Sequence, residues 1–395
     1  MPTTLRQLFL QHVAQTSDAP LGIEVAHAQG VYITDISGKK YIDLIAGIGV
    51  STVGHRHPLV LQNIENQLQK YMHLMVYGEY VQTPQVMLSQ KIAALMPPEL
   101  NNVYLVNSGT EATEGAIKLA KRYTQRTQII SFENAYHGST NGALSIMGSE
   151  FFKTEYRPLL PDTMALRYNQ TIDLEHITTK TAAVFVEGVQ GEAGYQVPCT
   201  AYMQALRRRC TDVGALLVFD EIQTGLGRTG AWFSFMHYGI APDVVLLAKG
   251  LGGGLPIGAF VASQRVMQVF KTNPFLGHIT TFGGNAVCCA SALGVLQAIE
   301  NEDLIAQIPE KEALFRSLLK HKKILRLTGR GLMLGLDVGS FEAVQAVISH
   351  CLTLGLITDW FLFNNQSLRI CPPLIITHEE IRHSCQMLLE GLDTL

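Results

Sequence analysis

Short apolar runs recur along the middle of the chain and alternate with segments of helical periodicity. VYLV precedes TEGAIKLAKRY, AAVFVEG precedes YMQALRRRC, and ALLVFDE, VVLLAKG and GAFVA follow. A run that is apolar at every position is typical of a strand buried on both faces. The alternation of such strands with helices predicts an α/β domain with a largely parallel central sheet flanked by helices.

The pattern is different at both ends of the chain. After about residue 290, a helical segment leads into short strand-like segments, KILRLTGRGLMLGLDV and SLRICPP, and then into an amphipathic helix behind a Thr377–Glu380 capping box. Near the other end, GVYITDISGKKYIDL predicts a hairpin that turns at Ser37–Gly38. We expect these two end regions to pack together.

Length and composition narrow the class of protein. Because 395 residues exceed one ordinary core, we predict an N-terminal segment (1–48) that packs with a small α+β domain (291–395), and a large domain (49–290). A net charge of −3 gives no footprint for nucleic acid, and no apolar run is long enough for a membrane span. Seven cysteines without a C-x-x-C pair, and an N-terminus without a signal-peptide pattern, predict a reduced, cytoplasmic protein.

Three segments carry candidate chemistry, and the first is DVVLLAKGLGGGLPIGAF at 243–260. Its glycines do not form a dinucleotide-binding loop, because Pro256 and a second strand follow where a helix should start. Lys249, at the end of a buried strand, either pairs with a carboxylate or is a partly desolvated amine of depressed pKa that forms a Schiff base.

The other two segments lie at a helix start and at another strand end. In NSGTEATEGAIKLAKRY, Ser108-x-x-Glu111 predicts a capping box. Gly109 and Thr110 open a helix whose free N–H groups suit a phosphate. The alternative is that the Ser and Thr only cap the helix. In LLVFDEIQTGLGRTG, Asp220 ends an apolar run and either needs a cationic partner or caps the next element.

One cofactor accounts for all three segments. Pyridoxal 5'-phosphate has a phosphate for the helix start, an aldehyde for Lys249, and a ring nitrogen that stays protonated beside a carboxylate such as Asp220. No metal is predicted, because His55 and His57 in GHRHP have no carboxylate or cysteine partner at ligand spacing. This stretch instead predicts a strand-to-helix turn, with Pro58 in the first helical turn.

The chain resembles the class III (ornithine, acetylornithine and 4-aminobutyrate) aminotransferases of the fold-type I pyridoxal phosphate enzymes. The resemblance runs from YIDLIAGIGVSTVGHRHP to LRICPPL and includes, in order, NSGTEA, YHG, VEGVQGEAG, FDEIQTGLGRTG, AKGLGGGLPIGA and TTFGGNAV. It implies the fold-type I transferase fold and a homodimer with active sites at the interface.

The resemblance also implies a role for each matching residue. Lys249 forms the internal aldimine and then moves protons, and Asp220 pairs with the pyridinium nitrogen. The other cofactor positions that it implies are Ser108, Gly109 and Thr110 in the phosphate turn, Tyr136 and Ile222 on the two ring faces, Gln223 at the ring hydroxyl, His137 and Glu187 in their motifs, and Thr281, which reaches the phosphate of the neighbouring subunit.

Two further residues are implied to bind the substrate. Arg369 matches the arginine that grips a substrate carboxylate, and Glu192 resembles the acid that pairs with it when no carboxylate is bound. A swinging glutamate hides the arginine from an ω-amine in one half-reaction and exposes it to a 2-oxo acid in the other.

The sequence departs from the family at the position that usually reads the far end of the donor. Related enzymes carry HGR, whereas this chain has Ser139 after YHG. Tyrosine positions of ornithine enzymes align with Asp18 and Ile48, and Arg157 or Arg167 remain alternatives for the lost guanidinium. We therefore hypothesise an ω-amine donor whose far end is not read by an arginine at the usual place.

The resulting hypothesis is a pyridoxal phosphate aminotransferase. It moves a terminal amino group from an ornithine- or acetylornithine-like or other ω-amino donor to a 2-oxo acid, 2-oxoglutarate giving glutamate, by ping-pong chemistry. The alternatives are a racemase, aminomutase or decarboxylase on the same scaffold, and a non-catalytic protein that binds the cofactor.

Overall fold

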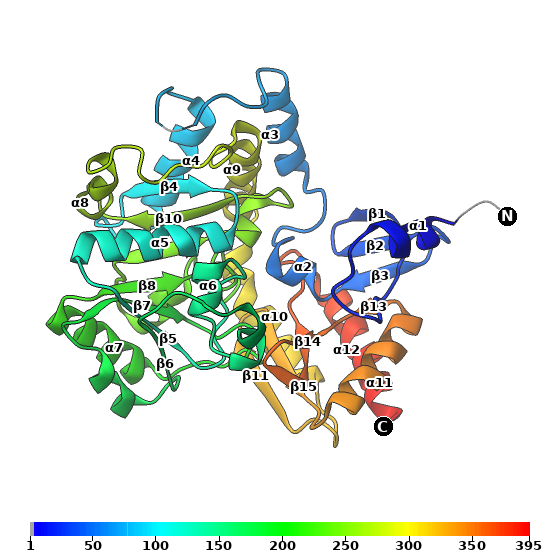
Figure 1. The fold of residues 1–395 in the computed structure, drawn as a ribbon. Coiled ribbons are helices and arrows are strands. Elements are labelled where there is room, and N and C mark those ends of the chain that lie inside the picture. Colours follow the sequence, from blue (N-terminus) through cyan, green and yellow to red (C-terminus); the bar gives the residue numbers. More distant parts are fainter. Residues whose placement is uncertain (1–3, 77) are drawn as a thin grey trace.

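The large sheet dominates one side of the molecule in the computed structural model, which describes residues 4–76 and 78–395 (Figure 1). Residues 1–3 of the predicted N-terminal segment lie outside the described part. The seven strands of the large sheet run in the order β4 (Asn102–Val106), β10 (Gly258–Ala262), β9 (Val244–Leu247), β8 (Leu216–Asp220), β7 (Thr181–Glu187), β5 (Gln128–Phe132) and β6 (Thr163–Leu166). Only β10 is antiparallel to its neighbours in this described sheet, so the predicted largely parallel sheet is confirmed.

Both faces of this sheet are covered, which explains the uninterrupted apolar runs. Leu246 packs in a cluster with residues of one long helix, while Val245, its neighbour in β9, packs in a second cluster on the other face. The helices around the large sheet are α3 (Pro58–Leu68), α4 (Thr83–Ala94), α5 (Gly109–Thr124), α6 (Asn141–Ser145), α7 (Thr200–Val213), α8 (Gln264–Met267) and α9 (Ala286–Asn301). Of these, α5 covers the first face, and α7 and α9 pack in the second cluster.

The two ends of the chain lie together on the other side of the molecule, in blue and in orange to red (Figure 1). One sheet has the order β1 (Val25–Gln29), β2 (Tyr32–Asp35), β3 (Lys40–Asp43) and β13 (Leu356–Ile357), and the other has the order β11 (Arg326–Arg330), β12 (Met333–Asp337), β15 (Asn364–Ile370) and β14 (Trp360–Phe361). β13 of the C-terminal region pairs with β3 of the N-terminal hairpin in a parallel register.

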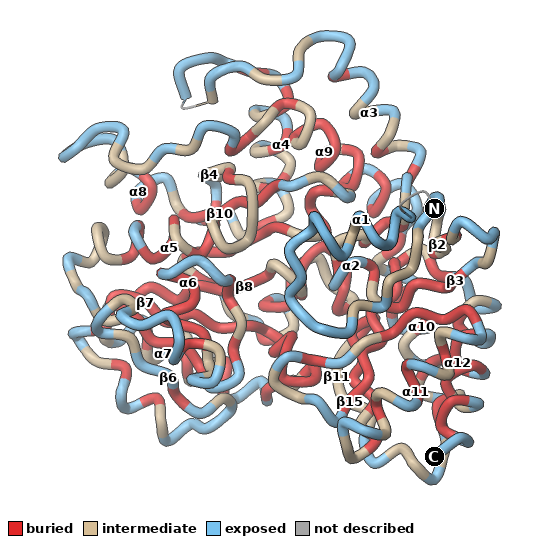
Figure 2. Tube along the Cα trace, turned by 45° about the vertical axis from the view of Figure 1, so that its right-hand side comes forward, coloured by how far each residue is buried: buried red, intermediate tan, exposed pale blue. Residues whose placement is uncertain are grey.

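The remaining helices belong to this side or to connections. They are α1 (Leu5–His12), α2 (Ala46–Gly49), α10 (Leu304–Leu318), α11 (Phe341–Leu354) and α12 (His378–Asp393). Thr377 and Glu380 form the predicted capping box of α12. Figure 2 shows the residues of β7, β8 and β10 as buried, whereas α1 is exposed and has no buried residue.

Short 3-10 turns complete the described chain: η1 (Glu150–Phe152), η2 (Thr154–Tyr156), η3 (Thr171–His176), η4 (Ser234–Tyr238), η5 (Lys249–Gly252) and η6 (Gln268–Lys271). His57 and Pro58 start α3 as predicted, with the ring of His57 capping the helix. No helix among the described residues is long and apolar enough to cross a membrane. The boundaries 1–48, 49–290 and 291–395 stay a prediction.

Candidate active site

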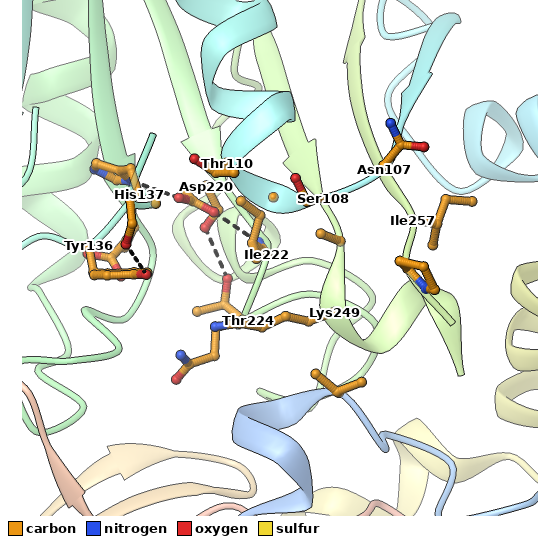
Figure 3. Close-up of a pocket in the computed structure, with 18 of the residues that line it drawn as sticks. Asn107, Ser108, Thr110, Tyr136, His137, Asp220, Ile222, Thr224, Lys249 and Ile257 are labelled. Atoms are coloured by element: carbon orange, nitrogen blue, oxygen red, sulfur yellow. Dashed lines mark hydrogen bonds and ion pairs between the residues drawn. The ribbon is translucent and has the colours of Figure 1, made fainter. Parts of the chain in front are cut away.

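A cavity of about 520 Å³ opens where β7, β8 and β9 end and α5 begins. This is the edge of a parallel sheet at which ligands usually bind. Most of the residues singled out in the sequence line it: Ser108, Gly109, Thr110, Tyr136, His137, Ser139, Glu187, Glu192, Asp220, Ile222, Gln223 and Lys249. Figure 3 shows Asp220, Lys249 and the start of α5 facing the same space.

Lys249 follows β9 directly and begins η5. Its φ of 43° is in the left-handed region, which costs a side-chain-bearing residue about 1 kcal/mol. Its amine forms no hydrogen bond or ion pair with any residue that the structure describes, so the pairing with a carboxylate is not found. Burial lowers the pKa of Lys249, which favours the uncharged, nucleophilic amine.

Asp220 ends β8 as a buried carboxylate that is fixed by two bonds. Its Oδ2 lies 2.6 Å from Nδ1 of His137, and its Oδ1 accepts from the Ile222 N–H at 3.0 Å. Burial lowers the pKa of His137, but the hydrogen bond and charge of Asp220 outweigh this effect and raise it. Asp220 therefore both caps the following turn and presents a held negative charge to the cavity, and His137 is the residue that holds it.

The start of α5 combines a cap with an open N-terminus. Ser108 accepts from the Glu111 N–H at 3.3 Å, but the Glu111 carboxylate bonds the N–H of Asn107 at 2.7 Å and not that of Ser108. The predicted reciprocal capping box is therefore wrong in its second bond. A Cβ on Gly109 would lie 2.8 Å from Cδ1 of Ile222, so a larger residue there would have to displace the Ile222 side chain. The free N–H groups of this first turn suit a phosphate.

Three buried polar atoms of the cavity residues have no partner among the described residues: His137 Nε2, Glu187 Oε2 and Gln223 Oε1. Such atoms are rare in folded proteins and are expected where a polar ligand binds. Burial raises the pKa of Glu187 to about 8. Together with the α5 terminus, Asp220 and Lys249, these atoms fit a phosphorylated aromatic aldehyde such as the predicted cofactor.

Of the predicted substrate pair, Glu192 lines the cavity and Arg369 does not. Arg369 is buried behind Glu192 and donates from Nη2 to Oε2 at 2.8 Å and from Nη1 to Oε1 at 3.2 Å. Burial raises the pKa of Glu192, but Arg369 overcomes this and lowers it. The structure thus joins the two residues in the pairing that the resemblance implies for the state without substrate.

Ser139 stands at the cavity with no guanidinium beside it. Its Oγ lies 3.0 Å from the Tyr136 hydroxyl. The two alternative arginines do not reach the cavity wall: Arg157 pairs with Glu150 and Arg167 with Asp173. Among the residues described, no arginine lines the cavity.

Three other predicted positions are outside the lining of this cavity. Asp18, Ile48 and Thr281 are all exposed and do not line it within the described chain. Thr281 belongs to a loop whose preceding residue, Thr280, accepts a hydrogen bond from Asn107 at 3.0 Å.

Some lining residues were missed in the sequence. They are Val50, Asn107, Gly138, Thr224, Ala248 and Gly254–Ile257. All but Val50 lie beside residues that were singled out, so adjacency to a motif was the available signal. Val50 comes from the segment after α2, which the sequence pattern gave no reason to place at the cavity.

Comparisons with known proteins agree with the geometry of the cavity. The family model described as aminotransferase class-III matches residues 13–392. Acetylornithine aminotransferase of Methanopyrus kandleri is 36% identical over 94% of this chain and 94% of its own. A structure of ornithine aminotransferase from Toxoplasma gondii, described as having partial PLP occupancy at its active site, is 29% identical, with a TM-score of 0.91 over 98% of this chain and 92% of that one. A transaminase from the marine bacterium Virgibacillus is 25% identical, with a TM-score of 0.93 over 99% and 98%.

Proposed function

Because the chain belongs to the class-III aminotransferase family, we propose that it transfers the terminal amino group of an ω-amino donor to 2-oxoglutarate by ping-pong chemistry. It is an aminotransferase, whose substrates are a small-molecule amino donor and a 2-oxo acid. The predicted fold-type I architecture is confirmed by its structural likeness to transaminases. The donor, the acceptor and the residue roles below are the proposal.

Pyridoxal 5'-phosphate is the cofactor that the cavity fits. When bound, it supplies an aldehyde that takes up the amino group and a protonated ring that accepts electrons. The observation that carries the proposal is one cavity that holds the unpaired Lys249 amine, the Asp220 carboxylate and the α5 N-terminus. In this assignment Lys249 moves protons, Asp220 keeps the ring nitrogen protonated, and the N–H groups at Gly109 and Thr110 bind phosphate.

The paired Arg369 and Glu192 favour a transaminase over a racemase, aminomutase or decarboxylase. An enzyme with a single substrate needs no charge that is alternately hidden and shown. A buried arginine held by a carboxylate that lines the cavity suits an enzyme that binds a 2-oxo acid in one half-reaction and an amine in the other.

The cavity wall at Ser139 supports a donor without a carboxylate at its far end. A hydroxyl pair, Ser139 and Tyr136, occupies the place where related enzymes present an arginine. Hydroxyl groups donate and accept hydrogen bonds but do not neutralise a carboxylate. We therefore propose a diamine, or an ω-amine with a neutral far end, as the donor.

A homodimer is the assembly that the surface favours. Large apolar side chains are exposed beside Thr281, including Val81 (94%), Phe275 (74%) and Phe282 (57%). Val81 and Phe275 also line a second cavity of about 710 Å³ together with Thr280. Exposed apolar patches of this kind mark protein interfaces. We propose that a second copy covers this surface and receives Thr281 at its phosphate site.

The test is turnover with a panel of donors. The purified enzyme, loaded with pyridoxal 5'-phosphate, is given 2-oxoglutarate with 1,5-diaminopentane, L-ornithine, N-acetyl-L-ornithine or 4-aminobutyrate, and glutamate is measured. We expect glutamate to form only when both substrates are present. Consumption of far more than one equivalent of an amine per active site without any 2-oxo acid would instead favour a decarboxylase, racemase or mutase. Far faster turnover of N-acetyl-L-ornithine than of the diamine would contradict the donor proposal.

A further inference from the structure

The guanidinium of Arg369 is held on two separate edges. Glu192 accepts from the two η nitrogens, at 3.2 and 2.8 Å. Asp359 accepts from Nε at 2.8 Å, through its Oδ1. A guanidinium has five N–H groups in a fixed planar arrangement, so these two carboxylates use different N–H groups and do not compete for the same bond.

Asp359 belongs to a short segment, residues 358–363, that contacts Arg369 in several other ways. The carbonyl of Trp360 accepts from Nη2 at 3.2 Å, and the ring centroid of Phe361 lies 4.5 Å from the guanidinium carbon. The main chain is tied as well, since the N–H of Arg369 donates to the Asp359 carbonyl at 2.8 Å. This segment alone holds the arginine by its Nε, one η nitrogen, one face and its backbone.

Glu192 comes from a different part of the chain, the loop that follows β7. Apart from Arg369, its carboxylate accepts from the Leu362 N–H at 3.2 Å and from Gln223 at 3.4 Å. None of the contacts between Arg369 and the 358–363 segment passes through Glu192. If Glu192 leaves, those contacts remain, and one edge with two N–H groups becomes free. That edge is the one a substrate carboxylate needs for a bidentate pair.

We propose that Asp359 is a positioning residue for the acceptor half-reaction. It holds Arg369 through Nε while Glu192 leaves, so that the freed η edge already points into the cavity when the 2-oxo acid arrives. The inference rests on the proposed function, because it requires an acceptor whose carboxylate takes the place of the Glu192 carboxylate.

The electrostatics of the cluster favour the same division of roles. Burial raises the pKa of Asp359 to about 6, Arg369 opposes this rise, and the nearby Glu192 charge adds to it. Two carboxylates thus share one cation and repel each other. Departure of Glu192 removes that repulsion and leaves Arg369 to Asp359 alone, which lowers the cost of the departure.

The test compares two acceptors in the same direction of reaction. Apoenzyme is loaded with pyridoxamine 5'-phosphate and mixed with 2-oxoglutarate or with pentanal, an acceptor that has no carboxylate, and the return of the aldehyde form is followed by absorbance. For Asp359→Ala we expect the 2-oxoglutarate concentration at half-maximal rate to rise about tenfold, the scale of one lost charge-assisted hydrogen bond. The rate with pentanal stays unchanged, because that acceptor makes no use of Arg369.

Two further variants separate positioning from folding. Asp359→Asn keeps an oxygen that accepts from Nε but removes the charge, so we expect a smaller rise, again with 2-oxoglutarate only. Asp173→Ala removes a similar bond, from Nε of Arg167 at 2.9 Å, outside the cavity lining, and is expected to change neither reaction.

The results for the Asp359 variants and the wild type distinguish three cases. If the Ala and Asn variants slow both acceptors equally, Asp359 is only structural and the inference is wrong. If neither variant changes the 2-oxoglutarate dependence while the wild type reacts normally, the inference alone is overturned. A wild-type enzyme that does not react with 2-oxoglutarate contradicts the proposed function, and the inference falls with it.

Discussion

The two ends of the active-site cavity are built in different ways. At the cofactor end, Asp220 and Lys249 lie at the ends of the neighbouring strands β8 and β9, and α5 begins just after β4 of the same sheet. At the substrate end, Arg369 comes from β15 of the C-terminal region and Glu192 from the loop that follows β7. A strand end fixes a side chain through the sheet itself, whereas a site between two parts of the chain depends on contacts that either part can change.

The largest expected effect is at the cofactor end. Lys249→Ala removes the amine that bonds the cofactor and moves protons, so we expect glutamate formation to fall at least about a thousandfold. The measurement is the rate with the best donor of the panel. Lys320→Ala changes an exposed lysine and serves as the matched control. A Lys249→Ala enzyme with the wild-type rate would show that this lysine is not catalytic.

This contrast also explains what the sequence could predict. Asp220 and Lys249 each follow an uninterrupted apolar run, and the carboxyl ends of parallel strands meet at one edge, so their proximity followed from pattern alone. The role of His137 did not follow, because its bond to Asp220 joins residues 83 positions apart. Asp359 gave no signal at all, since its partner is reached only through the pairing of β14 with β15.

A second prediction concerns the charge at the cofactor end. Asp220→Asn removes the negative charge that keeps the ring nitrogen protonated, and we expect turnover to fall about a hundredfold, the scale of a lost preorganised charge. The chain offers a matched pair: Asp43 is also buried and lies 3.0 Å from His55, outside the cavity lining. Asp43→Asn is expected to lower stability with little change in turnover per folded enzyme. Equal losses in the two variants would show that Asp220 acts only through folding.

A substitution at the substrate end should change which amino donor is preferred and should not abolish activity. Ser139→Arg places a guanidinium at an exposed position of the cavity wall. We expect the ratio of kcat/KM for N-acetyl-L-ornithine to that for 1,5-diaminopentane to rise about tenfold, because a bidentate arginine pairs with a carboxylate and repels a second amine. Ser139→Met adds a long uncharged side chain and should not raise this ratio. A rise with Met as large as with Arg would mean that shape, and not charge, sets the preference.

The smallest expected effect is on stability and its pH dependence, and it separates two buried glutamates. The pKa of Glu187 rises from 4.5 to about 8 on folding, mainly by burial, so the folded apoenzyme holds a proton that the unfolded chain has lost. Stability from this group is full below about pH 4.5 and is lost as the pH rises towards 8. Glu187→Gln should flatten this decline in urea unfolding of the apoenzyme.

Glu221, whose pKa burial raises to about 7, instead binds Thr224, Ser234 and the Phe235 N–H. Glu221→Gln should therefore lower stability at every pH, because it weakens bonds that Glu187 does not make. If Glu187→Gln leaves the pH dependence as steep as in the wild type, the Glu187 carboxyl is already ionised in the folded apoenzyme and its unpartnered oxygen is solvated.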